Sequence, residues 1–349
     1  MSLSLAGSIA FNLLFNALAA YWVAAGIAAI ASRLCRVRAG RWRQLFLALP
    51  LAKVAWDVAR GVPAGSFFWL KAVGARQDLG HFRVGVGVRP PFVPVLELAL
   101  GAMKSGIEYP QSAAELAATG LTRHVGPHAP EAVGVTVIVV AVMLAGLRAV
   151  RARVSCREVD RQRRSAEVVE RFVLDGRRVD VVVADDYEGV PYLGVTRRPF
   201  VCFSRAVYAS LTPVERDAVL RHEIGHLANR DRLLFAVLNL FADLFWFVPL
   251  LPRRCREIQR EAEICADRWA VAHGASRAAL ASSLVRVASL SRLARAPALG
   301  LVRVSLLARR VGELLSDPSR ASRTSAALRA CAFALTLATV LLSLAFGNH

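Results

Sequence analysis

The chain has 349 residues, of which 55% are hydrophobic, and its formal net charge is +19. This apolar content exceeds the roughly 45–50% of ordinary soluble domains, and it excludes a disordered chain. A strongly basic balance would suggest nucleic-acid binding in a chain of average hydropathy. Here the basic residues flank apolar stretches and form no long run, so we expect a membrane protein and no direct contact with nucleic acid.

Two apolar stretches within residues 1–60 predict two transmembrane helices. The first, residues 1–32, carries no charge and lacks the basic start of a cleaved secretory signal. Five arginines follow within residues 33–43, which places this loop in the cytoplasm and the N-terminus outside. The second stretch, residues 45–60, is weaker because it contains Pro50 and, within the apolar run, the charged residues Lys53 and Asp57.

The remaining segments predict an alternating, multi-pass topology in the inner or plasma membrane of the cell. Residues 61–130 are of mixed polarity and form the expected extracytoplasmic loop. Residues 131–150 form a third transmembrane helix, and the arginines that follow it lie inside by the same rule. Residues 151–325 then form a cytoplasmic domain, and residues 326–349 form the last transmembrane helix. The bilayer is therefore one expected partner.

The segment "LTPVERDAVLRHEIGHLANRDR", residues 211–232, carries the clearest local signal. Thr212 and Glu215 have the spacing of a capping box, and Pro213 occupies the first helical position. The sequence therefore predicts a helix that starts here and continues to about Asn229.

The same helix contains the motif "HEIGH". His222 and His226 are four residues apart, so both imidazoles lie on one helical face and can reach one metal ion. Glu223 lies next to the first histidine, where it can accept a proton from the attacking water rather than bind the metal. The motif predicts one zinc ion with Glu223 as the catalytic base.

A third ligand is expected in "REAEICADRWAV", residues 260–271. Glu263 can supply the carboxylate of a His/His/Glu zinc site from a second helix. Asp267, one turn later, can accept the outer N–H of a ligating histidine. Glu261 is the competing ligand, but it has no aspartate one turn later and points off that face.

The apolar residues 233–252 lie between the two halves of this site. A membrane-crossing helix here would separate Glu263 from the histidines by about 30 Å, too far to share one ion. We therefore expect the segment to dip into the membrane face or to pack within the domain, with Asp243 at the interface. Asp231 could anchor a helix end or bind an arginine.

Residues 165–204 alternate in polarity and predict a short sheet upstream of the metal helix. The runs "RRVDVVVAD" and "GVTRRPFVCFSRAV" are the expected strands. A sheet edge can pair with an extended substrate, and residues 200–203 are the expected edge.

His273 is either a transition-state group or a structural residue near a helix end.

These motifs resemble the membrane metallopeptidases of the BlaR/MecR antirepressor type. The resemblance rests on HEIGH with its flanks, on "EICADRWAV" and on "ARRVGELL" at residues 308–315. It implies a gluzincin-like α+β domain with zinc on His222, His226 and Glu263, Glu223 as base, and Asp267 behind the ligands. It also implies a cytoplasmic protein substrate, such as a transcriptional repressor, in signal-dependent proteolysis.

Three alternatives stay open at this point. The HtpX-type and CAAX-prenyl-protease enzymes have similar motifs, but they place two transmembrane helices between the second histidine and the glutamate. A non-catalytic signalling scaffold is disfavoured by the intact Glu223. Nothing in the sequence up to His349 resembles a penicillin-binding domain, so a signal is expected to enter through residues 61–130, through the transmembrane helices or from a partner protein. A separate sensor protein or a homodimer is the expected partner.

Overall fold

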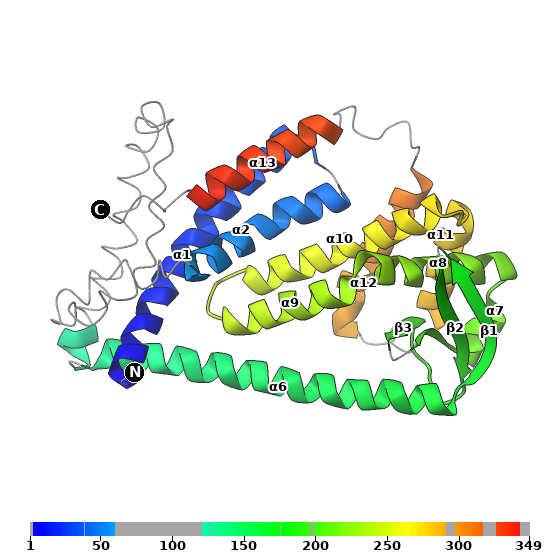
Figure 1. The fold of residues 1–349 in the computed structure, drawn as a ribbon, viewed down its shortest axis with the longest axis horizontal. Helices are drawn as coiled ribbons and strands as arrows, with labels where there is room; N and C mark the ends of the chain where they lie inside the picture. The colour runs from blue at the N-terminus through cyan, green and yellow to red at the C-terminus, as the bar shows by residue number, and fades with distance from the viewer. Residues whose placement is uncertain are drawn as a thin grey trace.

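The computed structural model describes residues 3–37, 39–59, 121–126, 128–174, 176–195, 198–290, 297–316 and 326–342 (Figure 1). The described residues are mostly helical and contain one small sheet. The predicted loop 61–130 lies almost wholly outside the described residues, so its position stays a prediction.

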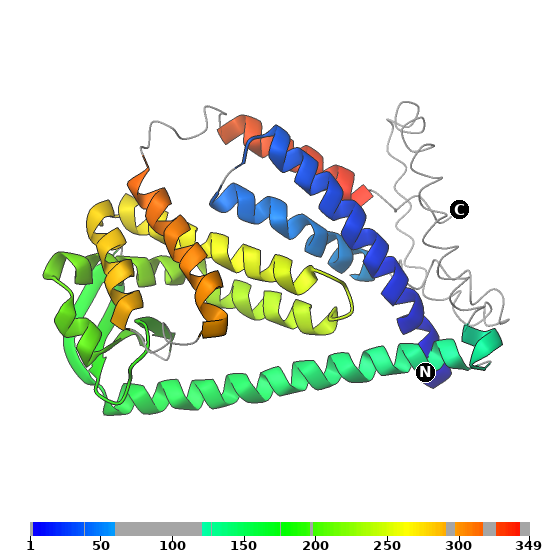
Figure 2. The same cartoon turned by 180° about the vertical axis from the view of Figure 1, so that it is seen from behind.

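Three apolar helices lie side by side at one end of the molecule, as both views show (Figures 1 and 2). They are α1 (Leu3–Leu34), α2 (Arg41–Ala59) and α13 (Ala326–Leu342). Lys53 of α2 is fully buried between them, and its ammonium group donates a hydrogen bond to the carbonyl oxygen of Leu341 at 3.3 Å.

One helix among the described residues is long and apolar enough to cross a membrane, over residues 131–165. It belongs to α6 (Ala129–Ser165), and shorter apolar helices cover residues 20–34 and 326–341. At 1.5 Å per residue α6 is about 55 Å long, against about 30 Å for the hydrocarbon core of a bilayer. The third transmembrane helix expected at residues 131–150 is therefore part of a longer helix that continues to the sheet, while the multi-pass topology stays a prediction.

The sheet follows directly on α6 and has four strands in the order β1-β2-β4-β3. The strands are β1 (Glu167–Leu174), β2 (Arg177–Ala184), β3 (Tyr192–Val195) and β4 (Pro199–Ser204). β2 is antiparallel to β1 and parallel to β4, whereas β3 is antiparallel to β4.

The prediction that residues 200–203 form a sheet edge is wrong. β4 lies between β2 and β3, with Val201 opposite Val181 on one side and Leu193 on the other. Its residues Phe200 to Ser204 are all buried, as expected of an interior strand covered on both faces. The second predicted strand is divided into β3 and β4, and β1 and β3 are the edges among the described strands.

The metal-motif helix and its neighbours complete the domain: α7 (Arg205–Ser210), α8 (Pro213–Asn229), α9 (Asp231–Leu244), α10 (Leu251–Ala272), α11 (Arg277–Leu290) and α12 (Pro297–Leu315). The predicted capping box starts α8: the Glu215 amide donates to Thr212 Oγ1 at 3.3 Å, and the Thr212 amide donates to Glu215 Oε2 at 2.8 Å.

Residues 233–252 do not form one membrane-crossing helix. They form α9, a turn and the start of α10, and these two helices make a hairpin between α2 and α6 (Figures 1 and 2). The apolar side of the hairpin packs against α1 and α2 in one buried core: Ala17, Ala20, Tyr21, Leu47, Leu51, Val54, Leu238, Phe245, Val248, Leu251, Cys255 and Ile258. The expected return of the chain is confirmed.

Asp243, which was expected at a membrane interface, is buried at the end of α9. Its carboxylate pairs with the guanidinium of Arg148 on α6 through both oxygens, with 2.8 Å between Asp243 Oδ1 and Arg148 Nη2. The pair therefore joins the hairpin to α6.

Candidate metal centre

The two histidines of HEIGH face the same point from adjacent turns of α8. Their Nε2 atoms are 3.2 Å apart, and their rings lie nearly at right angles. The His222 side chain is 7% exposed and that of His226 is 13% exposed, so both lie within the domain.

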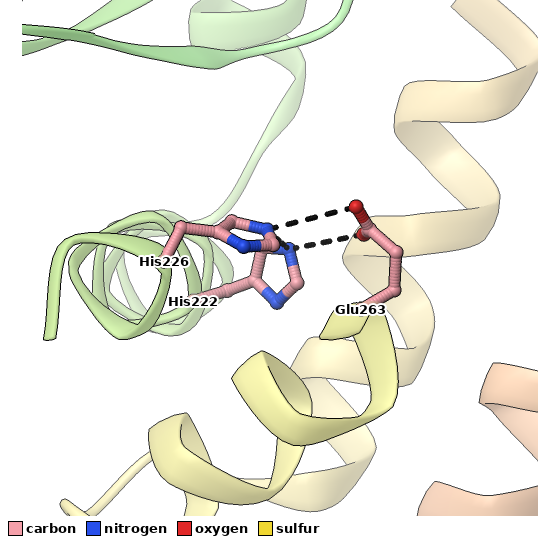
Figure 3. A group of neighbouring side chains, drawn as sticks. All are labelled: His222, His226 and Glu263. Carbon is pink, nitrogen blue, oxygen red and sulfur yellow. Dashed lines mark hydrogen bonds and ion pairs between the residues drawn. The ribbon is translucent and has the colours of Figure 1, made fainter. Parts of the chain in front are cut away.

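Glu263 approaches the same point from α10 (Figure 3). Its carboxylate oxygens lie 3.6 Å from His222 Nε2 and 3.7 Å from His226 Nε2. Ligand atoms about 2.0–2.1 Å from a zinc ion at tetrahedral angles are about 3.3–3.4 Å apart. The three residues thus have the spacing of a His/His/Glu metal site, and they are the one group of this kind among the described residues.

A glycine inside the motif allows α8 and α10 to approach closely. A Cβ atom on Gly225 would lie 3.2 Å from the Ala266 carbonyl oxygen and 3.3 Å from Ala266 Cα. Ala266 is itself fully buried, with no side chain beyond Cβ to separate the helices. This close crossing brings Glu263, one turn before Ala266, within reach of the histidines.

Each histidine has a carboxylate on its outer nitrogen. Asp267 Oδ1 lies 2.9 Å from His222 Nδ1, as the spacing on α10 predicted. Asp231 Oδ2 lies 2.7 Å from His226 Nδ1, a contact that the sequence analysis did not predict. It depends on Arg230, whose left-handed backbone (φ 58°) breaks the helix and turns Asp231 back towards the ring. Such carboxylates fix the tautomer and orientation of a ligating imidazole.

Arg310 on α12 is the functional residue that sequence reasoning missed. Its guanidinium binds both oxygens of Asp267, at 2.7 and 2.8 Å, and lies 2.9 Å from Glu263 Oε2. It lies 88 positions beyond His222, so no helical spacing links it to the motif. The one signal in the sequence was its place in "ARRVGELL", the segment that supported the family resemblance.

Charge in the site is balanced around Arg310. Burial raises the pKa of Glu263 and Asp267, but Arg310 and His222 lower it more, to about 2 for Asp267 and well below the usual range for Glu263. Both groups are therefore ionised at neutral pH, as a metal ligand and its supporting carboxylate must be.

The pKa of Glu223 shifts in the opposite direction. It is buried beside the first histidine, and burial raises its pKa above the ordinary value, with a further rise from Glu263. The neighbouring histidines and Arg310 oppose this rise. A carboxylate whose pKa is raised towards neutrality is a better proton acceptor at neutral pH.

Two further residues singled out from the sequence lie elsewhere. Glu261 points away from the histidines and contacts Gly40, Arg43 and Arg309 instead. His273 caps the C-terminus of α10, where its ring stacks on Trp269 and its Nδ1 lies 2.7 Å from the Trp269 carbonyl oxygen. It lies ten residues beyond Glu263, about 15 Å along the helix, and its contacts are local ones at the helix end.

The small sheet, the HEIGH helix and the glutamate from the next helix, beside a long apolar helix, define a membrane-associated metallopeptidase. The profile of the BlaR1 peptidase M56 family matches residues 130–312. This match covers more than half of the chain, and the protein belongs to this family. The predicted family resemblance is confirmed, whereas no curated protein matches the chain.

Proposed function

We propose that the protein is a multi-pass membrane zinc endopeptidase that cleaves a cytoplasmic protein. One zinc ion is bound by His222, His226 and Glu263, and Asp267 and Asp231 orient the two imidazoles. The observation that carries this proposal is the mutual spacing of 3.2, 3.6 and 3.7 Å among the three ligand groups. Three protein ligands leave a fourth position open, as catalytic zinc sites do.

The reaction is hydrolysis of a peptide bond. A zinc ion held by His222, His226 and Glu263 would supply Lewis-acid chemistry for the carbonyl group and the attacking water. Glu223 accepts the proton of the attacking water and then transfers it to the nitrogen of the leaving amine, so it ends the cycle as a carboxylate. Asp267 and Asp231 keep both histidines in the tautomer whose Nε2 lone pair faces the ion.

β3 is the proposed binding edge for the substrate. It packs against α8 and forms ladder hydrogen bonds only with β4 among the described strands, so its other edge can pair with an extended peptide. Pairing there brings a peptide alongside the HEIGH helix. β3 therefore replaces residues 200–203, which lie in the interior strand β4, as the expected edge for substrate binding.

The cytoplasmic location of the site and a repressor-like substrate rest on the arginine distribution and on the family. A quality-control protease of the HtpX or CAAX-prenyl-protease type is the second candidate. The single hairpin α9–α10 between His226 and Glu263 favours the antirepressor type, because the second type has two transmembrane helices there. The presence of Glu223 beside the ligands disfavours a non-catalytic scaffold.

Substrate trapping tests this function in native membranes. The variant Glu223→Ala should still bind zinc and substrate but should not release products, so the substrate should co-purify with it. Recovery of a repressor supports regulated proteolysis, and recovery of misfolded membrane proteins supports quality control. Wild-type levels of product from the variant would contradict the mechanism.

A further inference from the structure

Glu261 is a buried carboxylate on α10 that the catalytic mechanism does not use. It is 1% exposed, and it lies two residues before the ligand Glu263. Two residues correspond to about 200° around a helix, so the two side chains lie on nearly opposite faces of α10. A buried carboxylate is costly unless its charge and hydrogen bonds are compensated. Its partners therefore determine where this part of α10 can lie.

The partners of Glu261 come from two separate parts of the chain. The first is the end of the α1–α2 link with the start of α2: the Gly40 amide donates to Glu261 Oε2 at 2.9 Å, and Arg43 Nε, in the first turn of α2, lies 3.0 Å from Oε1. The second is α12, where Arg309 Nη2 donates to Oε1 at 2.7 Å. Gly40 has a positive φ of 84°, a backbone conformation that favours glycine.

Two more observations tie the same link to the metal centre. Arg268, also on α10, donates to the carbonyl oxygen of Ala39 at 3.2 Å and to Glu313 of α12 at 3.0 Å. Arg309 is followed by Arg310, so adjacent residues of α12 bind Glu261 on one face of α10 and Glu263 with Asp267 on another. The α1–α2 link, α10 and α12 thus meet in one network of charged side chains around the buried Glu261.

We propose that Glu261 is a positioning residue of the metal centre, through which the α1–α2 link holds α10 at the rotation that presents Glu263 to the histidines. This inference rests on the proposed function. A shift of α1 or α2 would be transmitted to the ligand by these contacts and by the core that α10 shares with both helices. Residues 60–120 follow the C-terminal end of α2, so a signal received there would travel along the helix, about 24 Å, to reach Arg43.

The experiment measures zinc affinity of the purified full-length chain by competition with a chromophoric chelator. Glu261→Ala should weaken zinc binding about tenfold, in the range seen when groups behind metal ligands are removed. Glu261→Gln keeps an acceptor for the Gly40 amide and should restore part of the affinity. Arg43→Gln, in the first turn of α2, should also weaken zinc binding, although Arg43 touches no metal ligand.

Glu257→Gln is the matched control. Glu257 lies one turn before Glu261 on the same helix, and it pairs with Arg253 and Arg254 of that helix at 3.7 and 3.4 Å. This variant should bind zinc as the wild type does. An unchanged zinc dissociation constant in folded Glu261→Ala and Arg43→Gln would overturn the proposal and leave Glu261 a structural residue.

If Glu261→Ala does not fold, the zinc affinities of Arg43→Gln and Arg309→Gln test the proposal instead. Each of these variants leaves Glu261 with two of its three partners. Hydrolysis by the zinc-loaded wild type is measured separately. Its absence would contradict the proposed function without altering the affinity comparison.

Discussion

Each histidine of the metal centre is held by a different kind of neighbour. Asp267 reaches His222 from the helix that also carries Glu263, so both residues were predictable from one spacing of four. Asp231 reaches His226 only because α8 ends at a left-handed residue. Sequence spacing predicts partners within one helix, but it does not predict contacts that depend on how a helix ends or on which distant helix packs nearby, as with Arg310.

The capping residue Glu215 offers a test of residue-level electrostatics. Its carboxylate accepts hydrogen bonds from Ser282 at 2.6 Å and from the Thr212 amide, and Arg286 lies 3.7 Å away. Ser282 is the main cause that keeps the pKa of Glu215 below its ordinary value of 4.5, although partial burial opposes the effect. The charged form therefore stabilises the fold at pH values above about 4.5.

Glu215→Gln should lower the free energy of unfolding by about 1 kcal/mol at pH 7. The difference from wild type should shrink as the pH falls through the lowered pKa, since protonation removes the same charge. Thermal unfolding of both chains at several pH values measures this. Glu158→Gln, whose partners Arg161 and Gln162 lie on its own exposed turn, is the control. A pH-independent difference would contradict the assignment.

At the scale of elements, the close crossing of α8 and α10 decides whether the ligands meet. Gly225→Leu should push the two helices apart, because even a Cβ there approaches backbone atoms of Ala266 at 3.2 Å. Zinc binding should weaken more than tenfold while the helical content persists. Gly312→Leu is the control, since no described atom lies within 4 Å of its Cβ position. Equal zinc affinity in the two variants would show that the crossing is not critical.

The sheet shows where element-level prediction failed. Strand β2 was predicted from its alternation, but the next apolar run was read as one strand at an edge. The residues of β4 pair on both sides because β3 lies antiparallel along one side and β2 lies parallel along the other. Composition alone pointed to a buried strand, since Phe200 to Phe203 form an uninterrupted apolar run.

At the scale of the whole molecule, the helix hairpin packs the metal-site domain against α2 and α6. The capped HEIGH helix and the carboxylate helix followed from local patterns, and the requirement that Glu263 reach the histidines excluded a crossing at residues 233–252. The packing of α10 against α1 and α2 could not be predicted, because apolar helix faces do not specify their partners. The buried Glu261 network was hidden for the same reason.

The proposed topology makes a direct prediction. A cytoplasm-active reporter fused after Leu147 should be active, and one fused after Phe346 should be inactive, because the arginine-flanked ends lie inside. A periplasm- or exterior-active reporter at the same two sites should give the opposite pattern. Activity of the cytoplasm-active reporter at both sites would contradict the proposal that the last helix crosses the membrane.

Zinc content and hydrolysis by the purified full-length chain test the central claim most directly. Wild type and Glu223→Gln should each hold about one zinc ion, but the second should cleave the trapped substrate at least about 100-fold more slowly, since it lacks the base. Glu263→Ala should lose the ion, whereas Glu261→Ala should still reach one ion at saturating zinc. Full activity of Glu223→Gln, or zinc retained by Glu263→Ala and lost by Glu261→Ala, would contradict this account.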